Sequence, residues 1–520
     1  MVFRRINLKT IVKAILLGTA VILASCSTTA SNKKLTSKAD MAPSMEMTTD
    51  IPAGILTPNY IDSRIGELIS VDGVPTPETA QLIYDNLDFQ RGIQAFLSGI
   101  QIASMEAMRR GLETLGPANT TTLLFEDLMD SKALWLTPNT TSVYMVMWLQ
   151  LDDEPYVLET PPDVLGIIDD HWFKYVTDFG RLGADKNQGG KFLIIPPGYE
   201  GDIPEGYLAY NTNTFGNWVI WRGFQVDGSP KPAVDTTKEI FKAYPLSQKD
   251  NPPEMNFINV SGKFNNTTHN MDRTIFDEIN EVVQSEPSFG QNPEILGAFH
   301  AIGITKGQPF EPDERMQKIL SDAAEVASVT ARTIISQPRD DEFYLYGKDS
   351  VWTNPFVGGS YQFLQDGAHL LDARAAFHFF ATGITPAMAK DIIGKGSKYA
   401  IAYMDNQGNP LDGNKTYKVN VPDNVPAADF WSFTLYDNQT RAMLQTDQRF
   451  PGLDGNKEGL IKNADGSYDV YFGPVAPEGQ ENNWIQTIPN KGWNTLFRLY
   501  GPLEPWFERT WKPGEPELVE

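Results

Sequence analysis

Cysteine is almost absent from the sequence, because Cys26 is the only one among 520 residues. One thiol cannot form an internal disulfide, and it cannot build a zinc site of paired cysteines. Histidine is scarce as well. The five histidines are scattered along the chain, at His171, His269, His300, His369 and His378. Their spacing matches none of the usual zinc motifs, so we expect no metal and no cofactor.

Common catalytic motifs are also missing. The sequence contains no H-E-x-x-H, no G-x-S-x-G and no phosphate-binding P-loop. Positive charge is in deficit, since 43 lysines and arginines stand against 66 aspartates and glutamates, and the net charge is −23. The electrostatic field of a protein with so negative a net charge repels the phosphates of nucleic acid. Nucleic acid is therefore excluded as a partner, and no motif assigns a reaction.

The first residues have the pattern of an export signal. Two arginines precede an apolar run over 11–24, which is too short for a membrane-spanning helix of about 20 residues. The run ends at Leu23-Ala24-Ser25-Cys26, which resembles the bacterial lipobox. The pattern predicts a signal peptide over 1–25, cleaved before a lipid-modified Cys26 that anchors the protein in the bacterial cell envelope. Ser27 favours the outer membrane where the organism has one.

Residues 26–50 are rich in serine, threonine and lysine without an apolar period, which predicts a flexible tether. Beyond it, apolar spacings of three and four residues predict helices within 77–111 and over 273–284, 313–335 and 362–381. Short β-rich runs bounded by Pro, Gly and Asn predict strands in two regions. They lie at 143–149, 191–195 and 218–221, and at 399–404, 417–421, 430–436, 467–472 and 495–500.

Two sets of sequence blocks resemble a known pair of domains. The first set is LTPNTTSVY at 136–144, LDDEPYVL at 151–158, FLIIPPGY at 192–199 and WR at 221–222. The second set is ADFWSFTLYD at 428–437, DGS at 465–467, NW at 483–484 and FRLYGP at 497–502. In this order the blocks are similar to the paired domains of unknown function numbered twelve fifty-four and twelve fourteen. The resemblance implies exported bacterial proteins built on β-sandwich domains, without an established activity.

One position departs from that family. After Pro138-Asn139 the family usually has an aspartate before a threonine, whereas here Thr141 precedes Ser142. The chain therefore lacks that carboxylate, and any role it has in the family does not transfer.

The expected fold class is α+β, mainly β, with two antiparallel β-sandwich (jelly-roll-like) domains and accompanying helices. An N-terminal β-sandwich-like domain with leading helices is expected over 51–270, a helical connecting region over 271–395, and a C-terminal β-sandwich domain over 396–520.

Eight side chains are candidates for a functional site. His171 follows Asp169 and Asp170, so an acid–imidazole pair is available for proton transfer, and this histidine is the one catalytic candidate. An arginine that ends an apolar strand can hold a carboxylate ligand through two N–H groups, although pairing with an acid of the chain is the alternative. The candidates for ligand binding are Asn139, Tyr144, Arg222, Trp431, Asn483, Trp484 and Arg498.

Several of these residues have a structural interpretation as well. An Asn that follows Pro138 is typical of an Asx turn, and Tyr144 has the place of a half-buried core residue in its strand. Trp431 shares one face of its strand with Phe433 and Leu435, which favours core over a stacking surface for ligands.

Two functions are compatible with these patterns. The first is a membrane-anchored envelope lipoprotein that binds or converts a small molecule or glycan between its two β-sandwich domains, since ligand sites favour domain interfaces. The second is a non-catalytic interaction or scaffold protein of the envelope. A cleft that gathers His171, Arg222 and Asn483 would favour the first, and a flat apolar patch the second. The sequence leaves open whether the protein is an enzyme and what its oligomeric state is.

Overall fold

The computed structural model describes residues 46–519, and the chain divides into two compact units, Met1–Thr76 and Pro77–Glu520. The described part of the first unit carries a small antiparallel sheet of β1 (Tyr60–Ser63), β2 (Gly66–Val71) and β3 (Val74–Pro75). The predicted signal peptide, Cys26 and most of the predicted tether lie outside the described residues. Within 46–519, no helix is both long and apolar enough to cross a membrane.

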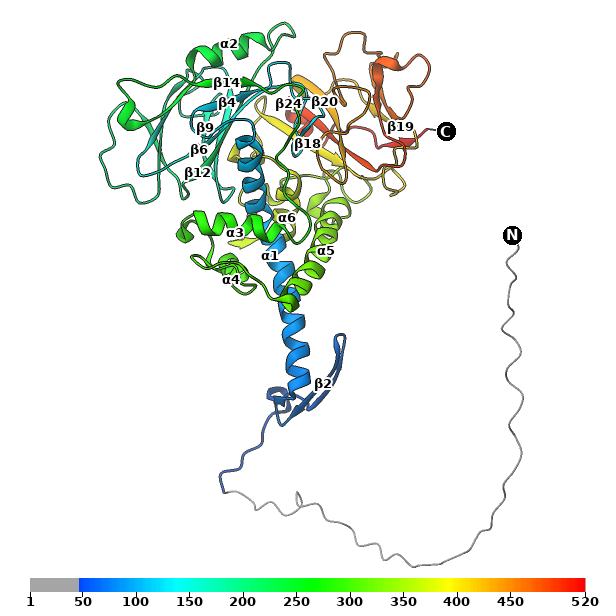
Figure 1. Ribbon diagram of the computed structural model, residues 1–520. Coiled ribbons are helices and arrows are strands. Elements are labelled where there is room, and N and C mark those ends of the chain that lie inside the picture. The colour runs from blue at the N-terminus through cyan, green and yellow to red at the C-terminus, as the bar shows by residue number, and fades with distance from the viewer. Residues whose placement is uncertain (1–45, 520) are drawn as a thin grey trace, which may run out of the picture. The chain divides into compact units, whose positions relative to one another are not determined.

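In the second unit, residues 121–259 contribute the strands of two sheets (Figure 1). These two sheets share a hydrophobic core. The larger sheet has six strands, in the order β14 (Asn256–Asn259), β4 (Thr121–Leu124), β6 (Val143–Gln150), β12 (Gly216–Gly223), β8 (Leu165–Asp170) and β9 (Tyr175–Gly180). The smaller sheet has four, in the order β11 (Leu208–Asn211), β10 (Gly190–Ile195), β7 (Tyr156–Thr160) and β13 (Lys242–Pro245).

Strand β6 is buried on both faces, which explains its almost uninterrupted apolar sequence. Met145 and Met147 belong to the core that the two sheets share. Tyr144 and Trp148 alternate with them and belong to a second, larger core that includes the helices. The six-stranded sheet therefore has one face against the smaller sheet and the other against the helical layer.

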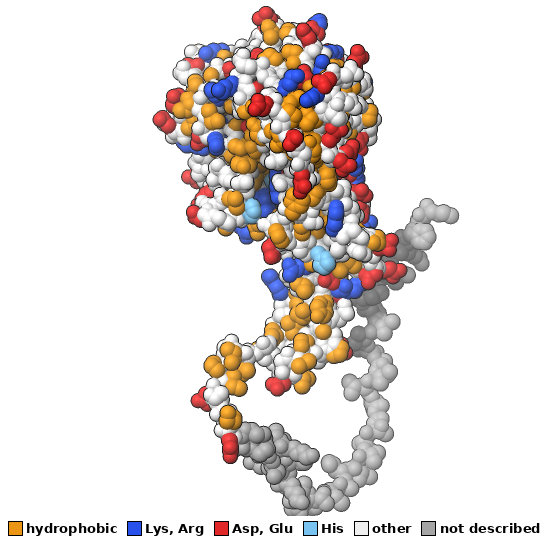
Figure 2. Space-filling model, turned by 90° about the vertical axis from the view of Figure 1, so that its left-hand side faces the viewer, with side chains coloured by type: hydrophobic (Ala, Val, Ile, Leu, Met, Phe, Trp, Pro, Cys, Tyr) orange, Lys and Arg blue, Asp and Glu red, His pale blue; other side chains and the backbone are white. Residues whose placement is uncertain are grey.

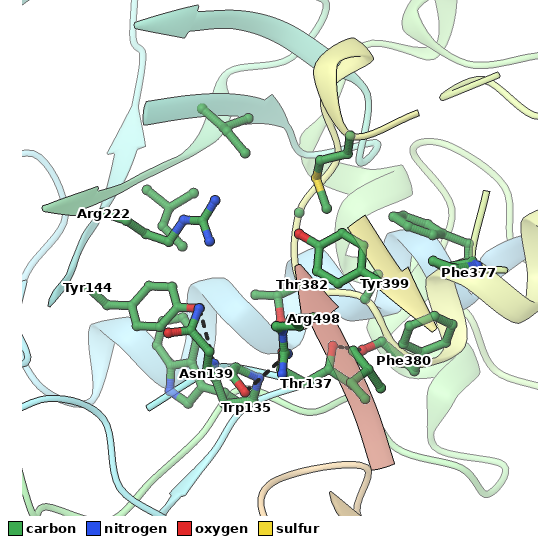
Figure 3. Close-up of a pocket in the computed structure, with 18 of the residues that line it drawn as sticks. Trp135, Thr137, Asn139, Tyr144, Arg222, Phe377, Phe380, Thr382, Tyr399 and Arg498 are labelled. Atoms are coloured by element: carbon green, nitrogen blue, oxygen red, sulfur yellow. Dashed lines mark hydrogen bonds between the residues drawn. The ribbon is translucent and has the colours of Figure 1, made fainter. Parts of the chain in front are cut away.

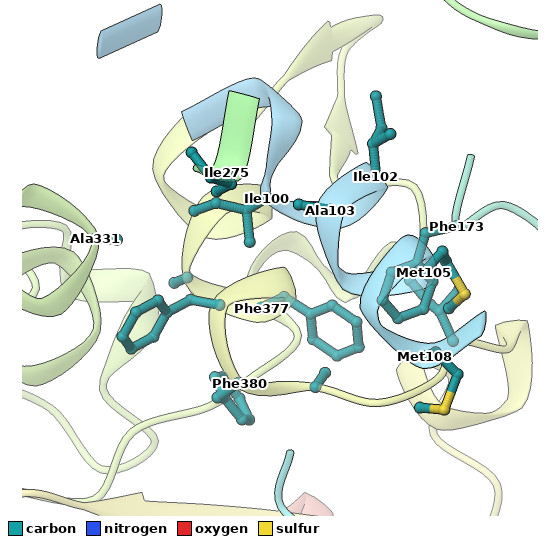
Figure 4. Packing of buried hydrophobic residues seen from close by; sticks show 14 of the residues in the cluster. Ile100, Ile102, Ala103, Met105, Met108, Phe173, Ile275, Ala331, Phe377 and Phe380 are labelled. Carbon is teal, nitrogen blue, oxygen red and sulfur yellow. The ribbon is translucent and has the colours of Figure 1, made fainter. Parts of the chain in front are cut away.

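The helical layer is built around α1 (Pro77–Glu113), which packs against α3 (Ile275–Ser285), α4 (Pro293–His300), α5 (Glu314–Ser336) and α6 (Leu371–Phe380). Figure 4 shows apolar side chains of α1, α3, α5 and α6 meeting in this core. Two glycines of α1 allow the close approach. A Cβ at Gly92 would lie 2.7 Å from Cβ of Ala323, and a Cβ at Gly99 would lie 2.2 Å from Cδ1 of Ile279.

The remaining helices are short: α2 (Lys231–Ile240), α7 (Pro386–Ala389) and α8 (Glu504–Phe507).

The C-terminal part repeats the arrangement of two sheets around a shared core. One sheet has the order β18 (Ser397–Ala402), β24 (Trp493–Pro502), β20 (Ala427–Asp437) and β21 (Gly452–Asp454). The other has the order β23 (Trp484–Gln486), β22 (Tyr468–Gly473), β19 (Tyr417–Val421) and β25 (Glu517–Leu518). On the first sheet, Tyr436 and Leu496 point away from the shared core and join the helical core instead. Side chains of both halves thus contribute to one central cluster.

The α+β class and most predicted elements are confirmed, with two corrections. The helix predicted over 362–381 begins only at Leu371, because Asp366 and Gly367 take positive φ and turn the preceding residues into the hairpin β16 (Leu364–Gln365) and β17 (Ala368–His369). The sheets are also not wholly antiparallel. Parallel pairing adds β11 to β10, β14 to β4 and β23 to β22.

Candidate functional site

A pocket lies between the two strand-rich halves of the second unit (Figure 3). Strands β6, β8 and β12 form one wall, β18 and β24 form the opposite wall, and the segment from Phe377 to Met388 closes the side between them. About 100 Å³ of the pocket is available to the centres of water molecules, where one water needs about 10–15 Å³. The pocket therefore has room for a small molecule of several heavy atoms.

The lining of the pocket is mostly apolar and includes no described acidic residue. Trp135 and Trp218 contribute from the N-terminal half, and Phe356, Phe377 and Phe380 contribute from the segment between the two halves. Indole Nε1 of Trp135 donates to Asn265 at 2.8 Å, which fixes that ring. Such aromatic walls suit the flat or apolar body of a ligand.

Two arginines face this apolar space from opposite walls. Arg498 of β24 is 3% exposed, and its guanidinium donates to Oγ1 of Thr434, the hydroxyl of Tyr436 and the carbonyl of Thr137, at 3.0, 2.7 and 2.9 Å. Neither Arg498 nor Arg222 of β12 forms an ion pair with any carboxylate within 46–519. The chain as a whole is strongly acidic, so two guanidinium groups without an ion pair in one pocket are local positive charges that can attract an anion.

Tyr144 adds a hydroxyl beside these arginines. It lies directly opposite Arg222 in the pairing of β6 and β12, so both side chains are on the same face of the sheet. The Tyr144 hydroxyl accepts from Nδ2 and the backbone N–H of Asn139, at 2.8 and 3.3 Å. Burial raises the pKa of Tyr144, with Arg222 and Arg498 acting in the opposite direction. The hydroxyl therefore keeps its proton at neutral pH and can donate it in a hydrogen bond to a ligand.

A side chamber continues the pocket past Arg222 and Tyr399, and it contains Asp178 of β9. One oxygen of this carboxylate accepts from Oγ1 of Thr385 at 2.9 Å and from the hydroxyl of Tyr175 at 3.1 Å. Burial raises the pKa of Asp178 to about 6, although both hydrogen bonds act to lower it. A carboxyl group that titrates close to neutrality thus lies within reach of the chamber.

The two strand-rich halves that form the walls of the pocket match two different family models. Residues 119–245 match the model described as Protein of unknown function (DUF1254), and 396–504 match the one described as Protein of unknown function (DUF1214). The chain carries both domains, in that order. Strands β6, β8 and β12 belong to the DUF1254 domain, and β18 and β24 belong to the DUF1214 domain. The predicted resemblance is thereby confirmed, and the pocket lies between the two domains.

Two solved structures show similarity to the chain. One is the crystal structure of a Vibrio parahaemolyticus protein, at 17% identity and a TM-score of 0.51, covering 83% of this chain and all of that one. The other is a putative uncharacterized protein from Burkholderia cenocepacia, at 11% identity and a TM-score of 0.37, covering 85% of this chain and 97% of that one. No curated protein matches the chain. The first likeness supports the fold alone.

Four of the eight predicted site residues line the pocket: Asn139, Tyr144, Arg222 and Arg498. Asn139 has a structural role there. Its Oδ1 accepts from the backbone N–H groups of Thr141 and Ser142 at 3.0 and 2.8 Å, which is an Asx turn. Thr141, which stands where the family usually has aspartate, contacts the hydroxyl of Tyr500 at 3.1 Å and so joins the two domains.

The other three ligand candidates lie in the DUF1214 domain away from the pocket. Trp431 is 5% exposed in the C-terminal core, so it packs and presents no stacking face. Asn483 is buried and bonds to backbone groups of Ile461 and Asp469. Trp484 is half-buried, and its Nε1 donates to the carbonyl of Gly473 at 2.8 Å. A cleft that gathers Asn483 with His171 and Arg222, which would have favoured a small-molecule site, is therefore not found among the described residues.

His171 is buried in an ion cluster and does not line the pocket. Its Nδ1 lies 2.8 Å from Oε1 of Glu286, and its Nε2 lies 3.2 Å from Oε2 of Glu106. All three side chains are at most 2% exposed. Burial acts against the charged ring, but the two carboxylates outweigh it and raise the pKa of His171. The two glutamates therefore favour the charged form of the buried ring, which makes His171 a structural residue rather than a catalytic one.

Glu106 is the other end of this cluster. Burial acts to raise its pKa, but contacts with His171 and Arg109 outweigh burial and lower the pKa to about 2. Arg109 reaches both oxygens of Glu106, at 2.6 and 2.9 Å, and Arg110 reaches one at 2.7 Å. The long-range pairing of Glu106 on α1 with His171 therefore fixes the helix against the DUF1254 domain.

Asp178 and Tyr399 complete the site, and sequence reasoning missed both. Tyr399 faces Arg498, whose guanidinium carbon lies 5.9 Å from its ring centroid. The direct pairing of the two residues in β18 and β24 explains this contact. No sequence signal distinguishes Asp178 from the many other acids of the chain.

Buried carboxyl groups make the stability of the protein depend on pH. Burial raises the pKa of Asp178, Asp170 and Glu278 to about 6, 7 and 8. Groups with a raised pKa stabilise the fold below their unfolded pKa, about 4, and lose this contribution as pH rises through the folded value. Glu106 acts oppositely, because its contribution is lost as pH falls through about 2. The melting temperature should therefore be highest near pH 4 and fall by pH 8.

The prediction is checked by calorimetry between pH 4 and pH 9, with Glu278→Gln as the matched variant. This neutral isostere should flatten the fall of the melting temperature at the alkaline end of the range. A melting temperature that rises from pH 5 to pH 8 would contradict the assignment of raised pKa values.

Proposed function

We propose that this protein binds a small anion with an apolar or aromatic body in the pocket between its DUF1254 and DUF1214 domains. The observation that carries the proposal is the pair of arginines, Arg222 and Arg498, which face an apolar space without a carboxylate partner among the described residues. The Tyr144 hydroxyl, on the same wall as Arg222, gives a third donor. A carboxylate ligand would satisfy all three donors while its apolar body contacts the aromatic wall.

The size of the pocket limits the ligand. Space for several waters fits a small carboxylic acid, whereas a chain of sugar units needs a longer groove. We therefore infer a small molecule rather than a glycan. In this proposal each half of the second unit is a β-sandwich, since its two sheets enclose one core, and the ligand binds where the two sandwiches meet.

The proposal is tested by isothermal titration with benzoate as the probe and benzyl alcohol as its uncharged analogue. Arg222→Met should weaken benzoate binding at least about tenfold, because it removes a charge-assisted hydrogen bond of about 1.5–3 kcal/mol. Arg339→Met is the matched control, since Arg339 is 87% exposed and lies outside this pocket. Equal affinity for benzoate and benzyl alcohol, or unchanged binding by Arg222→Met, would contradict the proposal.

We also propose that the protein is a lipoprotein of the bacterial cell envelope, held to the membrane by lipid on Cys26. The short apolar run and the lipobox-like ending support this localisation. Cys26→Ser should release the protein from the membrane fraction or block its processing, and it changes no other thiol because the chain has none. Membrane retention of a correctly cleaved Cys26→Ser protein would contradict the anchor.

A further inference from the structure

A second cavity is lined in part by helix α6 and is separate from the pocket between the domains. Residues of β9, of the segment 289–295 and of the β16–β17 hairpin surround it. About 390 Å³ is available to the centres of water molecules, which is more than in the first pocket. The two cavities share none of their described lining residues.

Arg374 of α6 is the central feature of this cavity. It is only 9% exposed, yet its guanidinium has no hydrogen bond and no ion pair with any residue within 46–519. A guanidinium carries five N–H donors and stays protonated, and none of these donors has an acceptor among the described residues. Burial lowers the pKa of Arg374, and no carboxylate among the described residues opposes this effect. An acceptor from outside the chain would supply the missing counter-charge.

Lys174 places a second positive charge in the same cavity. Its ammonium donates to the carbonyl of Gly290 at 2.5 Å. Burial lowers the pKa of Lys174, Asp170 acts to raise it, and the charge of Arg374 lowers it further. Asp170 compensates only in part, because burial raises the pKa of its own carboxyl group to about 7. Two like charges are therefore held near each other without a full counter-charge.

Two further polar side chains, Gln291 and His369, line the cavity. Nε2 of Gln291 is buried without a hydrogen-bond partner within 46–519, while its Oε1 accepts from the backbone N–H of Asn292 at 2.8 Å. Burial and the charge of Arg374 lower the pKa of His369 at the rim of the cavity, so this ring is neutral at pH 7. None of the described residues that line the cavity is acidic.

Aromatic rings form the rest of the wall. Tyr175 and Tyr361 meet edge to face with centroids 5.8 Å apart, and Phe173 packs against His378 with centroids 4.9 Å apart. The cavity thus combines cationic donors on one side with aromatic surface on the other. Figure 2 shows acidic and basic side chains interspersed over the visible outer surface, so this separation belongs to the interior.

We propose that this cavity is a second ligand site, which binds the phosphate or carboxylate group of a small aromatic molecule between Arg374 and Lys174. The oxyanion accepts from Arg374, Lys174 and the amide of Gln291, and the ring of the ligand lies against Tyr175 and Tyr361. This site is independent of the pocket between the domains, because no described residue lines both.

The test measures binding of phenyl phosphate, benzoate and inorganic phosphate to the full-length chain by isothermal titration. We expect Arg374→Met to lose at least about tenfold in affinity for the preferred probe, and Lys174→Met to lose affinity as well. Arg339→Met should leave this binding unchanged, because Arg339 is 87% exposed and lines neither cavity. Preference for phenyl phosphate over benzoate assigns a phosphate ligand, and the reverse assigns a carboxylate.

A second readout separates a ligand-binding arginine from a structural one. Without ligand, Arg374→Met should melt at or above the wild-type temperature, because it removes an unpaired buried charge. With the preferred probe, the wild type should gain more melting temperature than Arg374→Met. Failure of all three probes to bind, unchanged affinity in Arg374→Met, or a loss of stability in ligand-free Arg374→Met would overturn the proposal.

Discussion

Replacement of His171 by leucine is expected to destabilise the protein by about 3–5 kcal/mol, the usual cost of removing one partner from a buried ion pair. Most of this loss of stability arises at Glu286, because its carboxylate loses the imidazole that pairs with it. Glu106 keeps Arg109 and Arg110, whereas the Glu286 carboxylate would retain only the backbone N–H groups of Phe215 and Gly216. A buried carboxylate held by two amides alone is far less stable than one paired with a cation.

The matched control is His300→Leu. His300 is exposed and contacts only Thr305 through its ring, so its replacement should change stability by less than about 0.5 kcal/mol. Calorimetric melting at pH 6, where the His171 ring is charged, compares the two variants. A His171→Leu protein that melts like His300→Leu would show that the buried ion cluster does not stabilise the fold.

Trp431→Ala should cost a similar amount, about 3–5 kcal/mol, for a different reason. The indole is 5% exposed and contacts Phe433, Tyr468 and Phe497, with ring centroids 5.7–6.2 Å apart. Its removal leaves a cavity between the two sheets of the DUF1214 domain, and the surrounding strands cannot close that space fully.

Trp484→Ala serves as the comparison, since Trp484 is half-buried in the same domain and lies at a sheet edge. It should lose clearly less melting temperature than Trp431→Ala. Equal melting of Trp431→Ala and wild type would mean that Trp431 is not a core residue, and the alternative, a stacking surface for ligands, would then be favoured.

The strands and long helices follow from local patterns in the sequence. The alternation of Trp431, Phe433 and Leu435 on one face of β20 predicts their burial, and the structure confirms it. The α5 prediction over 313–335 also holds, because Asp313 caps the helix by accepting from the backbone N–H of Met316 at 2.8 Å. These features depend on neighbours along the chain, which a sequence displays directly.

The site depends on contacts between distant residues, and for that reason only part of it could be predicted. Arg222 and Arg498 were recognisable as strand-end arginines, but the absence of acidic partners appears only when the two domains are placed together. His171 looked catalytic beside Asp169 and Asp170, yet its partners are Glu106 and Glu286, which are 65 and 115 residues away in sequence. Arg374 was not among the predicted site residues. It lies in a predicted helix, and the sequence does not show that its side chain is buried without a partner.

The most direct test of the central claim is a crystal structure of the full-length chain grown with 4-bromobenzoate, in which the bromine is located by anomalous scattering. The claim predicts a carboxylate bound between Arg222 and Arg498, with the bromine against the aromatic wall and no such density in Arg222→Met crystals. An empty pocket between the domains at saturating 4-bromobenzoate, or a carboxylate turned away from both arginines, would contradict it.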